Sequence, residues 1–205
     1  MSEKKFHDKQ LFNQILLETE NFAVIPTLGS IVEGWLLIIP KKHYVSFGYM
    51  TNLCLFDELS ALLSQIEMIV KETYGDFVIF ENGAFCANSM VGCGVDYAHI
   101  HIVPTNLNLL KTVEDQFDLK YNWKQIEDLK ESIFYIKEGL PYLYYRDQQK
   151  QSFITTCDNI PSQLFRKAIA SSVGLIDKYD WKKEPFLDNI EKTIRNYRKH
   201  FQVLV

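Results

Sequence analysis

Residues 96–104 constrain the fold of this chain more than any other segment. Two of its five histidines, His99 and His101, lie here one residue apart, and apolar residues fill the alternate positions. Successive side chains of a β-strand point to opposite faces of a sheet. The spacing therefore predicts a strand on which Tyr97, His99 and His101 share one face, while the intervening residues Ala98 and Ile100 pack into a core on the other.

Composition limits the class of protein. Of 205 residues 47% are hydrophobic and 14% aromatic, which is enough for a large core and argues against extended disorder. A net charge of −4 does not suggest general nucleic-acid binding. We also expect no membrane association, because no apolar run approaches the roughly 18–20 residues of a membrane span. The charged start, followed by a short interrupted apolar stretch, does not fit a signal peptide.

The four cysteines have irregular spacing and form no CxxC pair. This use of cysteine predicts a reduced, cytoplasmic protein. Cys93 precedes the histidine strand, so a metal site formed by Cys93, His99 and His101 is an alternative. Tetrahedral zinc sites usually show closer ligand pairs, so we expect no metal and no other cofactor.

The first half of the chain has a regular pattern of predicted elements. Strands are expected at 20–25, 34–39 and 77–81, and the continuous apolarity of 34–39 predicts a strand that is covered on both faces. Helical spacing of apolar residues over 51–74 predicts a long helix that Gly75 ends. A glycine-containing loop at 82–94 then leads into the histidine strand.

After Pro104 the pattern is less regular. Residues 106–120 are polar with scattered leucines, 123–131 suggest a short helix, and 140–145 with 151–155 suggest a hairpin. Helices are predicted at 162–173 and 186–198. No repeat or low-complexity linker separates the two halves. We therefore expect a domain at 1–110 and an extension at 111–205 packed on it.

The paired histidines suggest phosphate chemistry. A neutral imidazole can attack an activated phosphorus, provided that the attacking nitrogen is unprotonated and an acceptor holds the other. Backbone donors at Gly92 and Gly94 could bind the phosphate oxygens. A single histidine on a strand is more often an ordinary core or surface residue, but two on one face after a glycine turn favour a functional site.

Several segments together resemble the histidine-triad family. Residues 97–104, Tyr-Ala-His-Ile-His-Ile-Val-Pro, are similar to its motif His-φ-His-φ-His-φ-φ with the first histidine replaced by tyrosine. Residues 18–26 and 34–43 resemble its amino-terminal hairpin, and 140–145 and 160–166 are similar to extensions of longer members. The resemblance covers roughly residues 10–105. It implies an α+β fold: a twisted antiparallel sheet of about five strands with one main helix, here with a mixed α/β C-terminal extension, in a protein that is usually dimeric.

The resemblance also implies catalytic roles. Members hydrolyse or transfer nucleoside phosphates, and their middle histidine attacks the α-phosphate. His99 would be this nucleophile, His101 the third histidine and Tyr97 the first position. A second register makes His101 the nucleophile and Val103 the third residue. The first register is preferred because Pro104 then falls where the family often has proline.

Three positions depart from the family pattern. Tyr97 replaces the first histidine, Trp35 stands where another histidine is common, and Thr27 stands where many members have Asp or Asn facing the ribose. An indole can donate but cannot accept a proton, so Trp35 would stack on a base or close the site. Thr27 can make only one of the contacts of a carboxylate. These changes affect positions that set rate and nucleotide specificity, and they leave the nucleophile in place.

Other polar residues are weaker candidates for substrate binding. Asn82 follows the third strand and could reach a phosphate, although Asn-Gly is also a common turn. Gln163 and Arg166 lie on one face of a predicted helix. Arginine suits phosphate recognition, but a surface salt bridge is an equally good interpretation. The group of His43 with Lys41 and Lys42 is better read as a solvated turn.

The leading hypothesis is a nucleotide phosphohydrolase or nucleotidyltransferase that forms a nucleotidyl-histidine intermediate. Its substrate would be a nucleotide or dinucleoside polyphosphate, and we expect a homodimer. The alternative is a non-catalytic nucleotide-binding or scaffold protein with a degenerate triad, motivated by Trp35, Tyr97 and Thr27.

Overall fold

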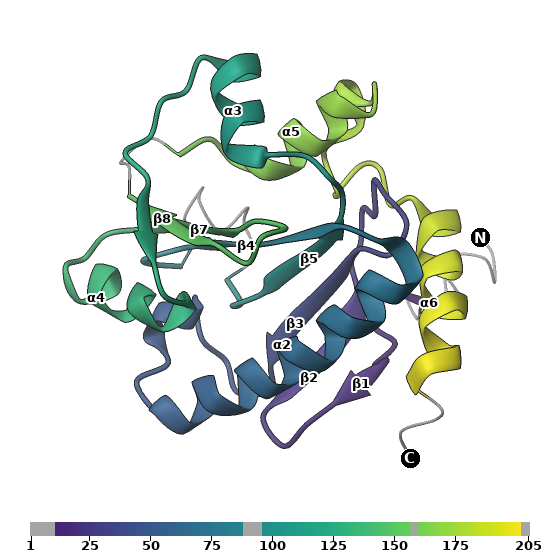
Figure 1. Ribbon diagram of the computed structural model, residues 1–205, viewed down its shortest axis with the longest axis horizontal. Coiled ribbons are helices and arrows are strands. Elements are labelled where there is room, and N and C mark those ends of the chain that lie inside the picture. Colours follow the sequence, from purple (N-terminus) through teal and green to yellow (C-terminus); the bar gives the residue numbers. More distant parts are fainter. Residues whose placement is uncertain (1–10, 88–95, 157–159, 202–205) are drawn as a thin grey trace.

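The fold is an eight-stranded antiparallel sheet with helices on both faces (Figure 1). The computed structural model describes residues 11–87, 96–156 and 160–201. The strand order is β1-β2-β3-β5-β4-β7-β8-β6. The strands are β1 Leu17–Glu18, β2 Phe22–Pro26, β3 Leu36–Pro40, β4 Phe77–Gly83, β5 Ile100–Pro104, β6 Lys124–Ile126, β7 Tyr142–Arg146 and β8 Ser152–Thr155. The helices are η1 Phe47–Tyr49, α2 Leu53–Tyr74, α3 Leu109–Phe117, η2 Leu129–Glu131, α4 Ser132–Lys137, α5 Leu164–Ser172, η3 Ile176–Lys178 and α6 Leu187–Phe201.

The predicted α+β class with an antiparallel sheet is confirmed, but the expected number of about five strands is wrong. Strands of the second half join the same sheet, because β7 pairs with β4 from Ile79 opposite Arg146 to Gly83 opposite Tyr142. β8 pairs with β7, and β6 pairs with β8. The sheet therefore crosses the predicted boundary at residue 110 without a break.

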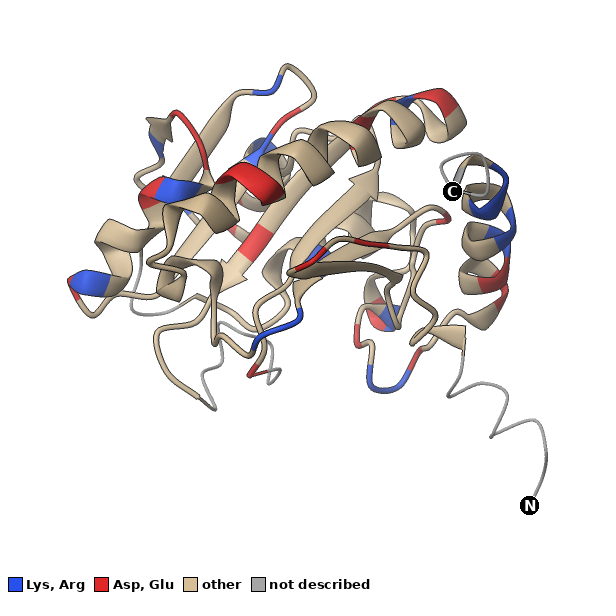
Figure 2. Ribbon diagram, turned by 90° about the horizontal axis from the view of Figure 1, so that it is seen from below, with Lys and Arg blue, Asp and Glu red and all other residues tan. Residues whose placement is uncertain are grey.

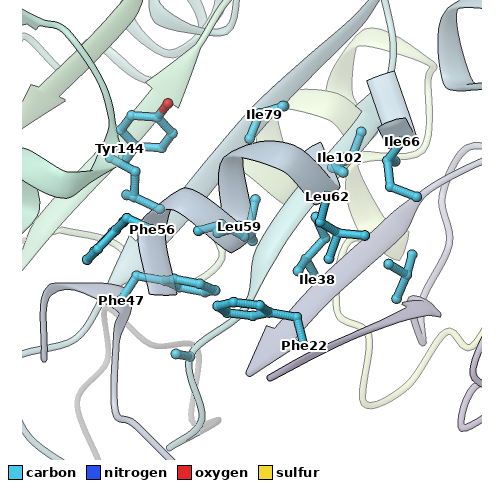
Figure 3. Packing of buried hydrophobic residues seen from close by; sticks show 14 of the residues in the cluster. Phe22, Ile38, Phe47, Phe56, Leu59, Leu62, Ile66, Ile79, Ile102 and Tyr144 are labelled. Carbon is cyan, nitrogen blue, oxygen red and sulfur yellow. The ribbon is translucent and has the colours of Figure 1, made fainter. Parts of the chain in front are cut away.

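The main helix α2 covers one face of the sheet. The Asn52 side chain accepts from the Cys54 N–H at its start, and Gly75 ends it at φ 85°, a conformation that favours glycine. Its apolar stripe of Phe56, Leu59 and Leu62 packs on residues of the central strands, as Figure 3 shows. Burial of this stripe accounts for the helical periodicity of the sequence.

The opposite face of the sheet is covered by α3 and α5, which lie above β7 and β4 in Figure 1. Trp35, Phe80 and Phe165 are fully buried in this second cluster. Phe80 lies between the other two, with ring centroids 6.1 Å from Trp35 and 4.8 Å from Phe165. The histidine strand β5 therefore runs through the centre of a sheet that has a core on each face.

The prediction that β3 is covered on both faces needs correction. Leu36 and Ile38 are buried with α2, whereas Leu37 and Ile39 are only half-buried. Leu37 and Ile39 line a cavity on the other face. The strand is apolar throughout because one face forms core and the other forms the wall of this cavity.

The predictions for the second half of the chain are confirmed in part. The hairpin of β7 and β8 and the helices α5 and α6 are confirmed. The short helix at 123–131 is wrong, since β6 and η2 occupy it, and α3 and α4 were not predicted.

The last helix, α6, packs against α2 and β2. Figure 2 shows Lys and Arg on α6 beside Asp and Glu, so this helix carries both signs of charge. Among the described helices, none combines the length and apolarity that crossing a membrane requires.

Candidate active site

His101 in β5 and His99, which immediately precedes this strand, lie on one side of the sheet and line the same cavity. His101 lies opposite Leu37 of β3 and opposite Phe80 of β4. Ala98 and Ile100 pack into the core under α2 on the other side. Tyr97, His99 and His101 share one side as predicted, but the strand begins at Ile100, so Tyr97 and His99 precede it. The His99 and His101 rings meet edge to face with centroids 4.8 Å apart.

The hydrogen bond of His99 fixes its tautomer. Its Nδ1 lies 2.7 Å from the backbone carbonyl of Tyr97, and a carbonyl only accepts, so Nδ1 carries the proton. The neutral ring then has its lone pair on Nε2. Burial lowers the pKa of His99, the bond to the Tyr97 carbonyl opposes this shift, and the charge of Arg166 adds to it. His99 is therefore a neutral imidazole with an unprotonated Nε2 at neutral pH.

His101 has the opposite arrangement. The indole Nε1–H of Trp35 donates to His101 Nδ1 over 3.0 Å, so Nδ1 is unprotonated. Burial lowers the pKa of His101 well below its usual range, with further lowering from His99 and Arg166. The ring is neutral and carries its proton on Nε2. The pair thus offers one lone pair, on His99, and one donor, on His101.

Arg166 of α5 brings a buried positive charge to the histidines. Its Nε donates to the Tyr179 carbonyl over 3.2 Å, and its Nη2 donates to the Gly29 carbonyl. The guanidinium carbon lies 4.7 Å from the centroid of the Trp35 ring, a cation–π contact. Gly29 adopts φ 74°, and a Cβ there would collide with Arg166 and Trp181. Arg166 is thereby held in a fixed orientation.

These side chains border a cavity of about 310 Å³. His99, His101 and Arg166 contribute polar side chains to its lining. The remaining walls are mostly apolar, and the full lining is Phe12, Ile25, Pro26, Thr27, Leu28, Leu37, Ile39, Tyr97, His99, His101, Arg166 and Trp181. The cavity therefore suits a ligand with an anionic group and a largely apolar or aromatic body.

Five of the predicted site residues line this cavity: Thr27, Tyr97, His99, His101 and Arg166. Two of them direct their hydroxyls to the backbone. Thr27 Oγ1 donates to the Leu28 carbonyl over 3.1 Å. The Tyr97 hydroxyl lies 2.7 Å from the Pro40 carbonyl and 3.1 Å from that of Lys41, so it supports the end of β3.

The structure places the other predicted residues elsewhere. Trp35 is fully buried behind His101, which leaves no ring face for a base to stack on. Asn82 is buried on β4, and Gln163 is buried and donates to Asp180 over 3.3 Å. Neither lines the cavity. Gly92 and Gly94, like Cys93 of the metal alternative, lie outside the described residues.

Sequence reasoning missed the apolar wall and Trp181. Leu37 and Ile39 could have been found, because they alternate with the core residues of β3 and so face the histidine side. Trp181 and Phe12 lie in segments without a regular pattern. Within the described residues, no group of three His, Cys, Asp or Glu side chains is placed to hold a metal ion.

Comparisons with known proteins give structural similarity alone. No protein-family model and no curated protein matches the sequence. The chain is similar in structure to histidine triad proteins. A hypothetical histidine triad nucleotide-binding protein from Sulfolobus tokodaii is 24% identical, with a TM-score of 0.38 over 44% of this chain and 59% of that one. This chain thus spans less than two thirds of that protein's length.

Two further solved structures show a similar degree of likeness. A Hit-like protein from Bartonella henselae, involved in cell-cycle regulation and solved with an unknown ligand, is 19% identical, with a TM-score of 0.38 over 66% of this chain and 95% of that one. A zinc-bound histidine triad family protein from Mycobacterium smegmatis is 19% identical, with a TM-score of 0.36 over 65% of this chain and 91% of that one. At these values the likeness decides neither activity nor ligand.

Proposed function

We propose that this chain is a histidine-triad-like nucleotide phosphohydrolase or nucleotidyltransferase in which His99 is the nucleophile. The observation that supports this most is the bond from His99 Nδ1–H to the Tyr97 carbonyl. It leaves Nε2 of a neutral ring as the reactive atom, in a residue that lines the cavity. A second hydrogen bond favours His99 over His101 as nucleophile, because the Trp35 Nε1–H occupies the lone pair of His101 Nδ1.

The reaction would be two successive displacements at an α-phosphorus. In the first, His99 Nε2 forms a bond to phosphorus, and the leaving group departs with the electron pair of its bond. In the second, water or another acceptor attacks the phosphorus, loses a proton to solvent and releases His99. Arg166 would neutralise charge on the phosphoryl oxygens, since arginine suits this geometry. The apolar walls would receive the nucleoside.

Turnover of a substrate panel tests this function. The panel contains dinucleoside polyphosphates and nucleoside phosphoramidates. We expect His99→Ala to lower kcat by about a thousandfold or more while the protein stays folded, because the covalent route is lost. His200→Ala is the matched control, since His200 contacts Thr73 and does not line the cavity. Equal turnover in His99→Ala and wild type would remove His99 from this role.

The alternative, a non-catalytic nucleotide-binding protein on the same fold, is favoured by the position of Tyr97. Its hydroxyl is bonded to backbone carbonyls, so the first triad position directs no imidazole at the ligand. This alternative predicts that nucleotides raise the melting temperature without being consumed. Product formation at a catalytic rate excludes it. A homodimer and a cytoplasmic location are further proposals of the same assignment.

A further inference from the structure

The buried indole of Trp35 contacts His101, and this contact fixes the ring. Its Nε1–H can only donate, and the atom opposite it, 3.0 Å away, is His101 Nδ1. Trp35 is fully buried and His101 is 4% exposed, so solvent has little access to this bond. A buried N–H without an acceptor costs free energy, so breaking the Trp35–His101 hydrogen bond is unfavourable.

Neighbouring rings restrict the His101 ring. Phe80 stacks on it with centroids 4.5 Å apart and planes inclined by 24°. His99 contacts it edge to face on the cavity side. A half-turn of the imidazole about its Cβ–Cγ bond would replace Nδ1 by a carbon atom opposite the indole. Trp35 therefore selects both the orientation and the tautomer of His101.

We propose that Trp35 is a positioning residue that holds His101 as a neutral Nε2–H hydrogen-bond donor toward the bound phosphate. His99 and His101 would then have opposite tautomers, Nδ1–H in the first and Nε2–H in the second. The nucleophilic lone pair and the donor come from adjacent rings without either ring being charged. The catalytic consequence rests on the proposed function, whereas the tautomers are properties of the protein without substrate.

The role of His101 follows from this assignment. A neutral imidazole N–H is a good hydrogen-bond donor but a very weak acid. His101 would stabilise negative charge on a phosphoryl or leaving-group oxygen without transferring its proton. Such a donor is useful where charge develops in the transition state.

Nitrogen NMR of ¹⁵N-histidine- and ¹⁵N-tryptophan-labelled protein tests the proposal without substrate. In the wild type we expect long-range spectra to show a protonated Nε2 and a bare Nδ1 for His101, and the reverse for His99. A scalar coupling between the Trp35 indole nitrogen and His101 Nδ1 should be visible across the hydrogen bond. A protonated His101 Nδ1, or no coupling at a resolved signal, would overturn the assignment.

The variant Trp35→Phe removes the donor and keeps an aromatic ring. We expect His101 to become a mixture of tautomers. With a substrate that the wild type turns over, kcat should fall about 10- to 100-fold with little change in KM, the size of effect known for residues that orient metal-ligating histidines. Trp123→Phe is the matched control, because the partly buried Trp123 packs against the same apolar cluster but stacks on Phe165. An unchanged His101 tautomer in folded Trp35→Phe would contradict the positioning role.

The two measurements separate this proposal from the proposed function. If no substrate is turned over but the opposite tautomers and the coupling are seen, only the proposed function fails. If substrate is turned over through His99 but His101 is protonated on Nδ1, only the role of Trp35 fails. If Trp35→Phe does not fold, the scalar coupling between Trp35 and His101 in the wild type decides whether the proposal holds.

Discussion

The protonation state of His99 makes turnover depend on pH. Because burial lowers the pKa of His99 below its ordinary value of 6.5, the ring stays neutral to lower pH than a free histidine. We predict that kcat/KM is flat through neutral pH and falls only below about pH 6.5, by about tenfold per pH unit, as His99 becomes protonated. A pH profile with a hydrolysable nucleotide measures this. A decline that begins above pH 6.5 would contradict it.

The charge of Arg166 belongs to the same site. Removing it should weaken the binding of phosphate-bearing ligands, because hydrogen bonds to charged groups contribute about 1.5–3 kcal/mol. We predict that Arg166→Gln weakens binding of a nucleoside monophosphate about 10- to 100-fold by calorimetry. It should also raise the pKa of His99, since Arg166 lowers it. Arg198→Gln, on the exposed side of α6, should change neither the ligand affinity nor the pKa of His99. An equal loss of affinity in both variants would show that net charge alone is responsible.

At the level of single residues, the sequence revealed the histidines but not their partners. The spacing of His99 and His101 predicts a shared face because strand geometry is local. The donor to His101 comes from Trp35, 66 positions away, and the acceptor for Arg166 comes from Gly29, 137 positions away. Such pairs depend on sheet topology, which local spacing does not contain. Trp35 was consequently predicted to meet the ligand, although it lies behind the histidine.

Among secondary-structure elements, length and periodicity decided what could be predicted. The helix α2 has 22 residues, a regular apolar stripe and a glycine at its end, so several signals agree. The strand β6 has three residues, too few for alternation to show. In α3 the buried Leu109 and Val113 do have helical spacing, but the surrounding polar residues hid it. Short elements depend on their neighbours for stability and leave weak patterns.

A buried carboxyl connects β4 with η1 and β7. Glu81 Oε1 accepts from the Phe47 N–H over 2.8 Å, and Oε2 accepts from the Tyr142 hydroxyl over 2.5 Å. Glu81 is 1% exposed, and burial raises its pKa to about 7 despite these two donors. Its folded pKa is above the unfolded value of 4.5, so its contribution to stability is present at acid pH and is lost as pH rises toward 7.

We predict that Glu81→Gln removes this loss of stability. Between about pH 5 and about pH 8 the unfolding free energy of the wild type should fall by on the order of 3 kcal/mol relative to that of the variant. His99 and His101 act in the opposite direction, because their lowered pKa values destabilise the fold as pH falls. The wild type and Glu81→Gln share this effect, so it cancels in the comparison. Urea unfolding at both pH values measures the difference. Glu138→Gln, a change at an exposed position, is the control. If stability falls equally with pH in the wild type and in Glu81→Gln, the assignment to Glu81 is refuted.

In the whole molecule, the second half of the chain completes both the sheet and the cavity. β7 covers the edge of β4, and α5 supplies Arg166. We propose that the predicted domain at 1–110 does not fold by itself. A chain ending at residue 110 should aggregate or lack a cooperative unfolding transition, since it leaves one edge of β4 unpaired and exposes the rest of the second core. Circular dichroism and gel filtration test this, and a monomeric fragment with a sharp melting transition would contradict it.

The most direct test of the central claim is a search for the covalent intermediate. The wild type is mixed briefly with a nucleoside phosphoramidate or a dinucleoside polyphosphate, quenched without acid, and analysed by intact mass and peptide mapping. We predict an added nucleoside monophosphate on His99, chased by a second acceptor and absent in His99→Ala. An adduct on another residue, or turnover through a ternary complex with no adduct at any time, would show that His99 is not the nucleophile.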